Sequence, residues 1–308
     1  VEALESGQYD LDNVSVLMTQ TGGGCRATNY IPLLRKALND AGFSQVPVVS
    51  VSMGNKGVES NPGFKFTLPM IKRLVVAFLY GDLFERVVYR TRPYETEKGM
   101  VDQLHQDWLK RVEANVRNGS LTQFNHFMKK IIRTFDEIPL QEIKKPKVGV
   151  VGEILVKYSP TANNDIVRLL EEEGAEAVVP DIVGFMNYSL YNQIWKYENM
   201  GMSKQSKRLA EFAIKIIELV EKPMDKALRK SVRFDGIHSI YDMVADASKI
   251  LSIGNHTGEG WFLTAEMIEL LKHEVNNIVC MQPFGCLPNH IVGKGVVKEL
   301  RRQYPQAN

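Results

Sequence analysis

The chain has 308 residues and a mass of 34.9 kDa, about twice the usual size of one domain, so two α/β lobes are expected. Its 44% apolar and 24% charged residues exclude a disordered chain, and a formal charge of +2 gives no electrostatic footprint for nucleic acid or an anionic membrane. Only three cysteines are present, which excludes a disulfide framework and favours a reducing compartment. No apolar run approaches the roughly 18 residues of a membrane span. We therefore expect a cytoplasmic protein with neither nucleic acid nor membrane as a partner.

The first half of the chain is predicted to begin as a β–α–β unit. In order, the expected elements are a strand at 14–19, a helix at 29–41 and a strand at 46–51. From residue 67 to about 136 the apolar spacing is helical, with almost no strand signal. This predicts part of a first α/β lobe at 1–64, followed by a helical segment at 65–145. Residues 1–7 resemble the last turns of a helix, so we expect a piece of a longer polypeptide.

A second α/β series opens after the polar joint Lys144–Lys147. The expected strands are 148–151, 177–179, 249–253 and 277–281, and the expected helices are 164–173, 187–231, 264–274 and 294–303. Strands that alternate with helices favour parallel sheets with right-handed crossovers. The prediction is a second α/β lobe at 146–308 that is truncated at its carboxyl end. The fold class is therefore α/β, with parallel sheets in both lobes and a helical insertion.

Three consecutive glycines and a cysteine follow the first predicted strand, namely Gly22, Gly23, Gly24 and Cys25. Open α/β sheets bind ligands at the carboxyl ends of their strands, and glycines leave backbone N–H groups free to face a ligand. A helix entrance favours the thiolate form of cysteine. The plain alternative is a tight turn with a buried thiol. The dinucleotide fingerprint is matched only loosely, because no acid ends the second strand.

A second cysteine loop, Val279–His290, leaves the last predicted strand. Pro283, Gly285 and Pro288 fix this loop and hold Cys286 outside regular structure. Cys280 falls within the strand and is expected to point into the core, and a loop histidine such as His290 usually makes a local hydrogen bond. Cys25 and Cys286 thus lie at strand exits in different halves of the chain. Soft thiolates that converge suit an iron–sulfur cluster, but two are too few without a further ligand.

Two other strand exits carry polar candidates. Glu153 follows the strand at 148–151, and His256 and Glu259 lie in the Gly-rich segment at 253–261. For Thr161 and Asn163, capping of the next helix is as well supported as a role at the site. Glu171-Glu-Glu173 is interpreted as a solvated helix face. For Lys72-Arg73 and Arg90-Thr-Arg92 the default interpretation is also solvated surface, and the alternative is contact with an anionic partner or substrate.

Four segments together resemble a known family. They are Thr19–Tyr30, Gly152–Lys157, Gly258–Phe262 and Gln282–His290. These resemble the dehydratase-like part of CoA-substrate-specific enzyme activase proteins, in the 2-hydroxyacyl-CoA dehydratase superfamily. The resemblance implies two Rossmann-like lobes with extra helices around a [4Fe-4S] cluster. It also implies an ATP-dependent activase as partner, which supplies low-potential electrons, and a CoA thioester or another difficult acceptor as substrate.

Carried over residue by residue, the resemblance implies Cys25 and Cys286 as cluster ligands. The family has a further cysteine upstream of the first strand, a position that precedes Val1, so this chain is expected to lack one ligand and to be without its cluster. The glycines Gly22, Gly23, Gly24 and Gly285 are expected to offer N–H groups to the cluster, and Glu153 and His256 to orient substrate or move protons. Two alternatives stay open: a non-catalytic module that docks the activase or regulates a partner, and a metal-free Rossmann protein that binds a nucleotide or CoA.

Overall fold

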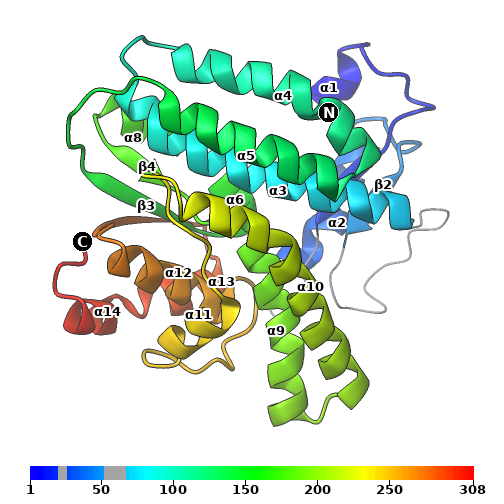
Figure 1. Ribbon diagram of the computed structural model, residues 1–308. Helices are drawn as coiled ribbons and strands as arrows, with labels where there is room; N and C mark the ends of the chain where they lie inside the picture. Colours follow the sequence, from blue (N-terminus) through cyan, green and yellow to red (C-terminus); the bar gives the residue numbers. More distant parts are fainter. Residues whose placement is uncertain (20–25, 52–66) are drawn as a thin grey trace. The chain divides into compact units, whose positions relative to one another are not determined.

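The computed structural model describes residues 1–19, 26–51 and 67–308 (Figure 1). These residues form an α/β protein that is mainly helical and contains small parallel sheets, as the alternating sequence pattern predicts. The chain divides into two units, Val1–Phe66 and Thr67–Asn308. None of the described helices has the length and apolar character that crossing a membrane requires.

The first unit contains the predicted β–α–β arrangement. Strand β1 (Val16–Thr19) pairs in parallel with β2 (Val48–Val51), with Val16 opposite Val48. Between the strands lie the short 3-10 helix η1 (Arg26–Asn29) and α2 (Tyr30–Asp40), and α1 (Glu2–Glu5) precedes β1. A small apolar core holds these elements together, formed by the buried side chains of Leu4, Leu38 and Val46.

The second unit has a three-stranded parallel sheet in the order β4–β3–β5. Its strands are β3 (Lys147–Gly152), β4 (Glu176–Val178) and β5 (Asn277–Met281). The central strand, β3, buries Val150 and Val151 completely, as expected of a strand covered on both faces. Helix α12 (Gly260–Lys272) packs so closely on the sheet that a Cβ on Gly149 would lie 2.5 Å from Leu270 Cδ1.

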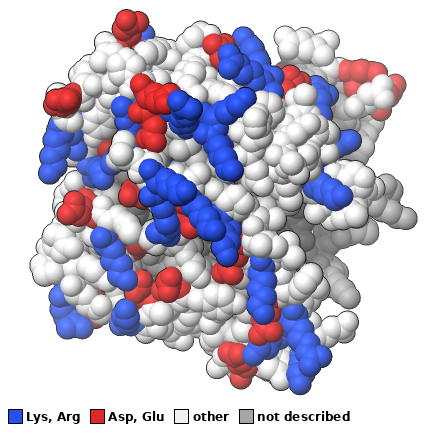
Figure 2. Space-filling view, in the orientation of Figure 1, with Lys and Arg blue, Asp and Glu red and all other residues white. Residues whose placement is uncertain are grey.

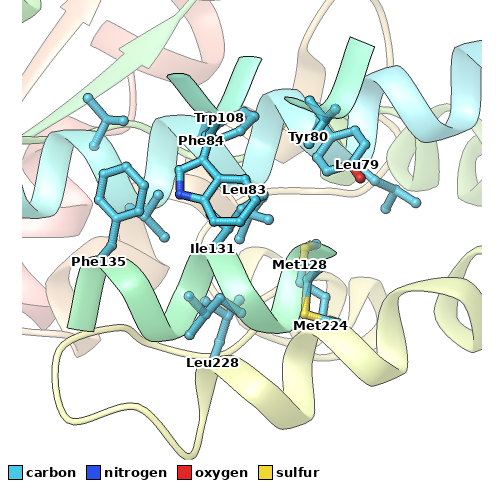
Figure 3. Packing of buried hydrophobic residues seen from close by; sticks show 14 of the residues in the cluster. Leu79, Tyr80, Leu83, Phe84, Trp108, Met128, Ile131, Phe135, Met224 and Leu228 are labelled. Carbon is cyan, nitrogen blue, oxygen red and sulfur yellow. The ribbon is translucent and has the colours of Figure 1, made fainter. Parts of the chain in front are cut away.

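The predicted helical stretch after residue 67 forms three long helices, α3 (Leu68–Thr91), α4 (Met100–Asn118) and α5 (Leu121–Glu137). They share an apolar core with α10 (Lys204–Leu228), which forms a hairpin with α9 (Ile182–Met200) (Figure 1). Figure 3 shows this core, with Leu83 of α3 and Ile131 and Phe135 of α5 among its fully buried side chains.

Short helices complete the second unit. They are η2 (Arg92–Tyr94), α6 (Ile154–Tyr158), α7 (Pro160–Asn163), α8 (Ile166–Glu172), α11 (Ile240–Ala247), α13 (Leu287–Asn289), the π-helical turn η3 (His290–Lys294) and α14 (Val297–Gln303). Asn163 Oδ1 accepts a hydrogen bond from the amide of Ile166, the first residue of α8, at 3.2 Å, although the N-cap residue of this helix is Asp165.

The prediction of a strand at 249–253 is wrong. Ser248–Leu251 instead continue α11 as a turn, in which the amides of Ile250 and Leu251 bond back to the carbonyl of Ala247 at 2.9 and 3.0 Å. Leu251 packs against the cores on both sides of α12, so its burial comes from helix packing and not from a sheet. Short apolar runs of this kind cannot be assigned to strand or helix by periodicity alone.

The solvated surface predicted for Arg92 and Glu171 is also wrong. Both side chains are only 9% exposed and pair with each other, Nε to Oε2 at 2.7 Å and Nη2 to Oε1 at 2.9 Å. Arg90 likewise pairs with Glu176, which is 1% exposed. Basic and acidic side chains are otherwise interspersed over the face in Figure 2, in keeping with the small net charge.

Candidate functional site

The exits of β3 and β5 are locked together by backbone geometry. Gly152 has a φ of +139°, and a Cβ at this position would lie 1.8 Å from the carbonyl oxygen of Met281, so only glycine fits. The next amide, that of Glu153, donates to the same carbonyl at 2.8 Å. This contact places the first residue after β3 beside the last residue of β5.

Glu153 itself begins α6. Its Oε2 accepts a hydrogen bond from the amide of Val156 at 2.9 Å, and the side chain is buried. Burial raises the pKa of Glu153, and the negative charge of nearby Glu259 raises it further. The carboxyl group therefore keeps a proton more readily than an exposed glutamate does.

The Gly-rich segment before α12 supplies the second carboxylate. Gly258 and Gly260 have φ values of +64° and +51°, and the hydroxyl of Tyr188 donates to the carbonyl of Gly258 at 2.8 Å. Between the two glycines lies Glu259, which is buried and accepts at both oxygens. Its Oε1 accepts from the amide of Ile154 at 3.1 Å, so it ties the segment to the exit of β3.

The third segment brings Cys286 to the same place. Cys286 is 2% exposed and directly precedes α13. The fully buried amide of Asn289 donates from Nδ2 both to Cys286 Sγ, at 3.0 Å, and to Glu259 Oε2, at 2.8 Å. One amide group thus bridges a sulfur and a carboxylate at the carboxyl ends of β3 and β5, where parallel sheets bind ligands.

Cys280 has a structural environment, as predicted. It lies in β5 and packs against the apolar core under the sheet. Burial raises the pKa of this thiol to about 11, and the charges of Glu266, Glu259 and Cys286 act in the same direction. At neutral pH the thiol stays protonated, which suits a core residue.

A buried ion pair lies beneath the site. Lys157 of α6 donates to Glu266 of α12 at 2.8 Å, and both side chains are 2% exposed. The pair fixes α6 against α12 and so holds the elements that carry Glu153 and Glu259.

The structure shows no contact of either histidine of these segments with Glu153, Glu259 or the sulfur of Cys286. The ring of His256 packs against that of Trp195 in α9, with 5.1 Å between centroids, and burial lowers its pKa. His290 is exposed, and its Nδ1 lies 3.2 Å from Gln282 Nε2 and 2.8 Å from the carbonyl oxygen of Cys286. This confirms the local hydrogen bond predicted for His290.

Of the four glycines predicted to face the cluster, only Gly285 lies among the described residues. Gly285 is exposed and has a φ of +66°, so it allows the sharp turn that leads into Cys286. The first cysteine loop, with Gly22, Gly23, Gly24 and Cys25, lies outside the described residues.

Sequence reasoning gave no role to Asn289, although the residue stands in the Cys286-Leu-Pro-Asn289 motif. The sequence did contain one indication of its role. Asn289 follows Cys286 by three residues, and residues three apart lie on the same face of a helical turn. The importance of the amide becomes visible only when Glu259, 30 residues earlier in the chain, is placed beside it.

The groups at this site that could bind a metal are one thiol, Cys286, and two carboxyl groups, those of Glu153 and Glu259. In the ranges 1–19, 26–51 and 67–308, no group of three or more His, Cys, Asp and Glu side chains could hold a metal ion. The site therefore fits a cluster only as the contributor of one thiolate, Cys286, whose sulfur already accepts an N–H···S bond.

Comparison with known proteins adds no assignment to this geometry. No family model matches the chain, and neither a curated protein nor a solved structure is significantly similar to it.

Proposed function

We propose that the chain is an iron–sulfur component of a 2-hydroxyacyl-CoA dehydratase-like system. In this proposal the chain contributes two Rossmann-like lobes, at 1–64 and 146–308, and Cys25, Cys286 and at least one ligand from elsewhere bind a [4Fe-4S] cluster. An ATP-dependent activase would supply low-potential electrons, and a CoA thioester or another difficult acceptor would receive them. The observation that supports this proposal is the amide of Asn289, which bridges Cys286 Sγ and Glu259 where β3 and β5 end.

The surroundings of Cys286 suit a sulfur that binds iron. An N–H···S hydrogen bond spreads the negative charge of a thiolate and, in iron–sulfur proteins, raises the reduction potential. Asn289 provides such a bond at 3.0 Å from a fully buried position, so its geometry is fixed. When bound, the cluster would supply one-electron transfer, and the protein would supply this bond and exclude water.

The carboxyl group of Glu153 is the group that this site offers for proton transfer. Burial raises its pKa, so it holds a proton more readily than an exposed glutamate does. The hydrogen bond to the amide of Val156 fixes its oxygen at the start of α6. His256 lies against Trp195, and any proton role for it would be exerted at that position.

The test is anaerobic reconstitution of the whole 308-residue chain with ferrous iron and sulfide, in the presence of a small thiol that can fill an open coordination position. Bound iron, bound sulfide and charge-transfer absorbance are measured. We expect cluster uptake by the native chain and its loss in Cys25→Ser and in Cys286→Ser.

The chain contains a matched control. Cys280→Ser changes a third cysteine in the same region of sequence, but one that packs in the core of the sheet, so it should leave cluster uptake intact. Circular dichroism establishes that each variant is folded. A native chain that binds no iron and sulfide, or a Cys286→Ser variant that binds as much as the native chain, would overturn the proposal.

A further inference from the structure

One cavity of the second unit contains a buried polar atom that lacks a partner. The cavity has a volume of about 510 Å³ and lies between α9, α10 and the start of α11. Asn187 of α9 and Glu221 of α10 both line it, and the two residues are 6% and 7% exposed. In the part of the chain that the structure describes, Oδ1 of Asn187 has no hydrogen-bond partner. A buried acceptor without a donor is unfavourable, so a donor from outside the chain is expected here.

Glu221 presents a second acceptor to the same cavity. Its carboxyl group is buried, yet it forms no hydrogen bond and no ion pair with the described residues. The charges of Asp181, Glu218 and Asp225 raise its pKa, and that of Arg86 lowers it. The guanidinium of Arg86 is itself paired with Asp181. Among the described residues, the carboxyl group of Glu221 therefore has no counter-ion of its own.

We propose that this cavity binds the protonated primary amine of a small organic molecule, with Asn187 Oδ1 and the carboxylate of Glu221 as its acceptors. A primary ammonium group has three N–H donors and one positive charge, so it can satisfy both acceptors and neutralise the carboxylate. A metal ion does not fit, because no three His, Cys, Asp and Glu side chains of the described residues are placed to hold one. This site is independent of the function proposed for Cys286.

The wall of the cavity opposite α9 is held in place before any ligand arrives. The amide of Ile237 donates to Asp225 Oδ1 at 2.8 Å, and its carbonyl accepts from Arg229 Nη2 at 2.9 Å. Asp225 and Arg229 also pair with each other at 2.8 Å, so neither charge competes for the ligand. His238 lines the cavity too, and its Nε2 lies 3.2 Å from Nε2 of His273. A fixed wall loses little conformational entropy on binding, which favours a site.

The rim of the cavity distinguishes two sources of such an amine. Lys215 and Lys222 line the cavity, are exposed, and form no ion pair with a described residue. Ser239 and Ile240, at the start of α11, line it as well, and the amino end of a helix carries partial positive charge. A carboxylate on the same molecule would find these positive charges, as in an amino acid, and a simple amine would not use them. We therefore expect an amino acid to bind more tightly than a simple amine of the same length.

The protonation of Glu221 gives the proposal a measurable consequence. Burial raises the pKa of this carboxyl group to about 8, and the charge of Asp181 adds to the effect, so the empty site holds a proton at pH 7. An incoming ammonium group takes the place of that proton, so binding at pH 7 releases close to one proton. The affinity should rise by about 10-fold from pH 7 to pH 9, because a primary ammonium with a pKa near about 10.4 stays charged while Glu221 ionises.

The proposal is tested by calorimetric titration of 4-aminobutyrate, butylamine and butyrate into the whole chain. The first two probes carry the ammonium group, and butyrate carries only the carboxylate and is the control ligand. We expect both amines to bind with dissociation constants of about 1 mM or below, 4-aminobutyrate the more tightly, and butyrate not to bind. Titrations in buffers with different heats of ionisation measure the number of protons released.

Substitutions separate loss of the site from loss of structure. Glu221→Gln keeps the shape of the protonated acid, so it should fold, bind both amines about 10-fold more weakly at pH 9 and release no proton at pH 7. Asn187→Leu should also weaken binding, with circular dichroism to establish that it is folded. Glu211→Gln changes a glutamate of α10 that does not line the cavity, and it should bind as the native chain does. If neither amine binds, if butyrate binds in their place, or if Glu221→Gln matches the native chain in affinity and proton release, the proposal is wrong.

Discussion

The two faces of helix α3 are held in place by different physical means. One face is apolar, with Val76, Leu79, Leu83 and Val87 at helical spacing, and all of them are at most 2% exposed (Figure 3). A second stripe of the same helix carries Asp82, Glu85, Arg86 and Arg90. Of these side chains, Asp82, Arg86 and Arg90 form directed contacts to the region of β4 and α9.

The difference shows which interactions give stability and which give position. Apolar contacts are non-directional, so the core of α3, α5 and α10 tolerates small shifts. The charged stripe does not: Asp82 accepts from the amides of Ile182 and Val183 at 2.9 and 3.0 Å and so caps α9 at one angle. We infer that the apolar face supplies most of the free energy of folding and the charged stripe sets where the sheet lies.

The largest effect is expected from the apolar face. Leu83→Ala removes a side chain with no exposed surface, and the lost contacts together with the cavity should lower the free energy of unfolding by about 2–5 kcal/mol. Urea unfolding followed by circular dichroism measures the change. Leu169→Ala is the control, because Leu169 is 47% exposed and should cost well under half as much. Equal losses at both positions would contradict the assignment of the core.

A smaller loss is expected from the charged stripe. Asp82→Ala leaves the amides of Ile182 and Val183 without their acceptor and should lower the free energy of unfolding by about 1–3 kcal/mol. Hydrogen exchange provides the sharper measurement, since the first turn of α9 should lose protection while α5 keeps it. Uniform loss of protection over both helices would show that Asp82 contributes to global stability and not to local position.

The apolar stripe was predictable from the sequence, and the charged one was not. Helical spacing alone identifies residues 67–136 as helix, and the β–α–β pattern identifies the small parallel sheets. By contrast, Arg92 and Glu171 were interpreted as surface because each is an ordinary charged residue in its own segment. Their burial depends on a pairing across 79 residues, and no local pattern records such a contact.

The candidate site shows the same limit. Glycines at strand exits indicated the segments that contain Glu153 and Cys286, because close approach of backbones has a local signature. The hydrogen bond from Asn289 to Glu259 and the contact between His238 and His273 have no such local signature. Each joins residues that are 30 or 35 positions apart in the chain. The sequence therefore predicted which segments contain the site, but not which side chains contact each other in the folded chain.

Buried carboxyl groups near the charged stripe should also make stability depend on pH. Burial raises the pKa of Glu221, in α10, to about 8, and the charge of Asp181 adds to the effect. An acid whose pKa is raised on folding stabilises the folded state below its ordinary pKa near 4.5, and this contribution is lost as pH rises through about 8.

The chain should therefore be less stable at pH 9 than at pH 5. Glu85 and Glu269, whose pKa values are raised to about 7 and about 8, act in the same direction. Glu221→Gln should reduce the stability difference between the two pH values by on the order of 4 kcal/mol, since the pKa moves from 4.5 to about 8 and a tenfold change in ionisation constant corresponds to about 1.4 kcal/mol. Urea midpoints at pH 5 and pH 9 measure it. An unchanged difference in the variant would show that Glu221 is not the group that titrates.

The smallest effect is expected where charges pair in solvent. Glu113 and Arg117 of α4 form an ion pair one helical turn apart, with an N–O distance of 2.7 Å, but their side chains are 61% and 78% exposed. Water screens such a pair, so Glu113→Gln should change the free energy of unfolding by no more than about 0.5 kcal/mol, and added salt should remove even that. Arg92→Lys, which disrupts the buried pair with Glu171, should cost more at every salt concentration. If both variants respond alike to salt, burial is not what distinguishes the charged stripe and its neighbours from ordinary surface charges.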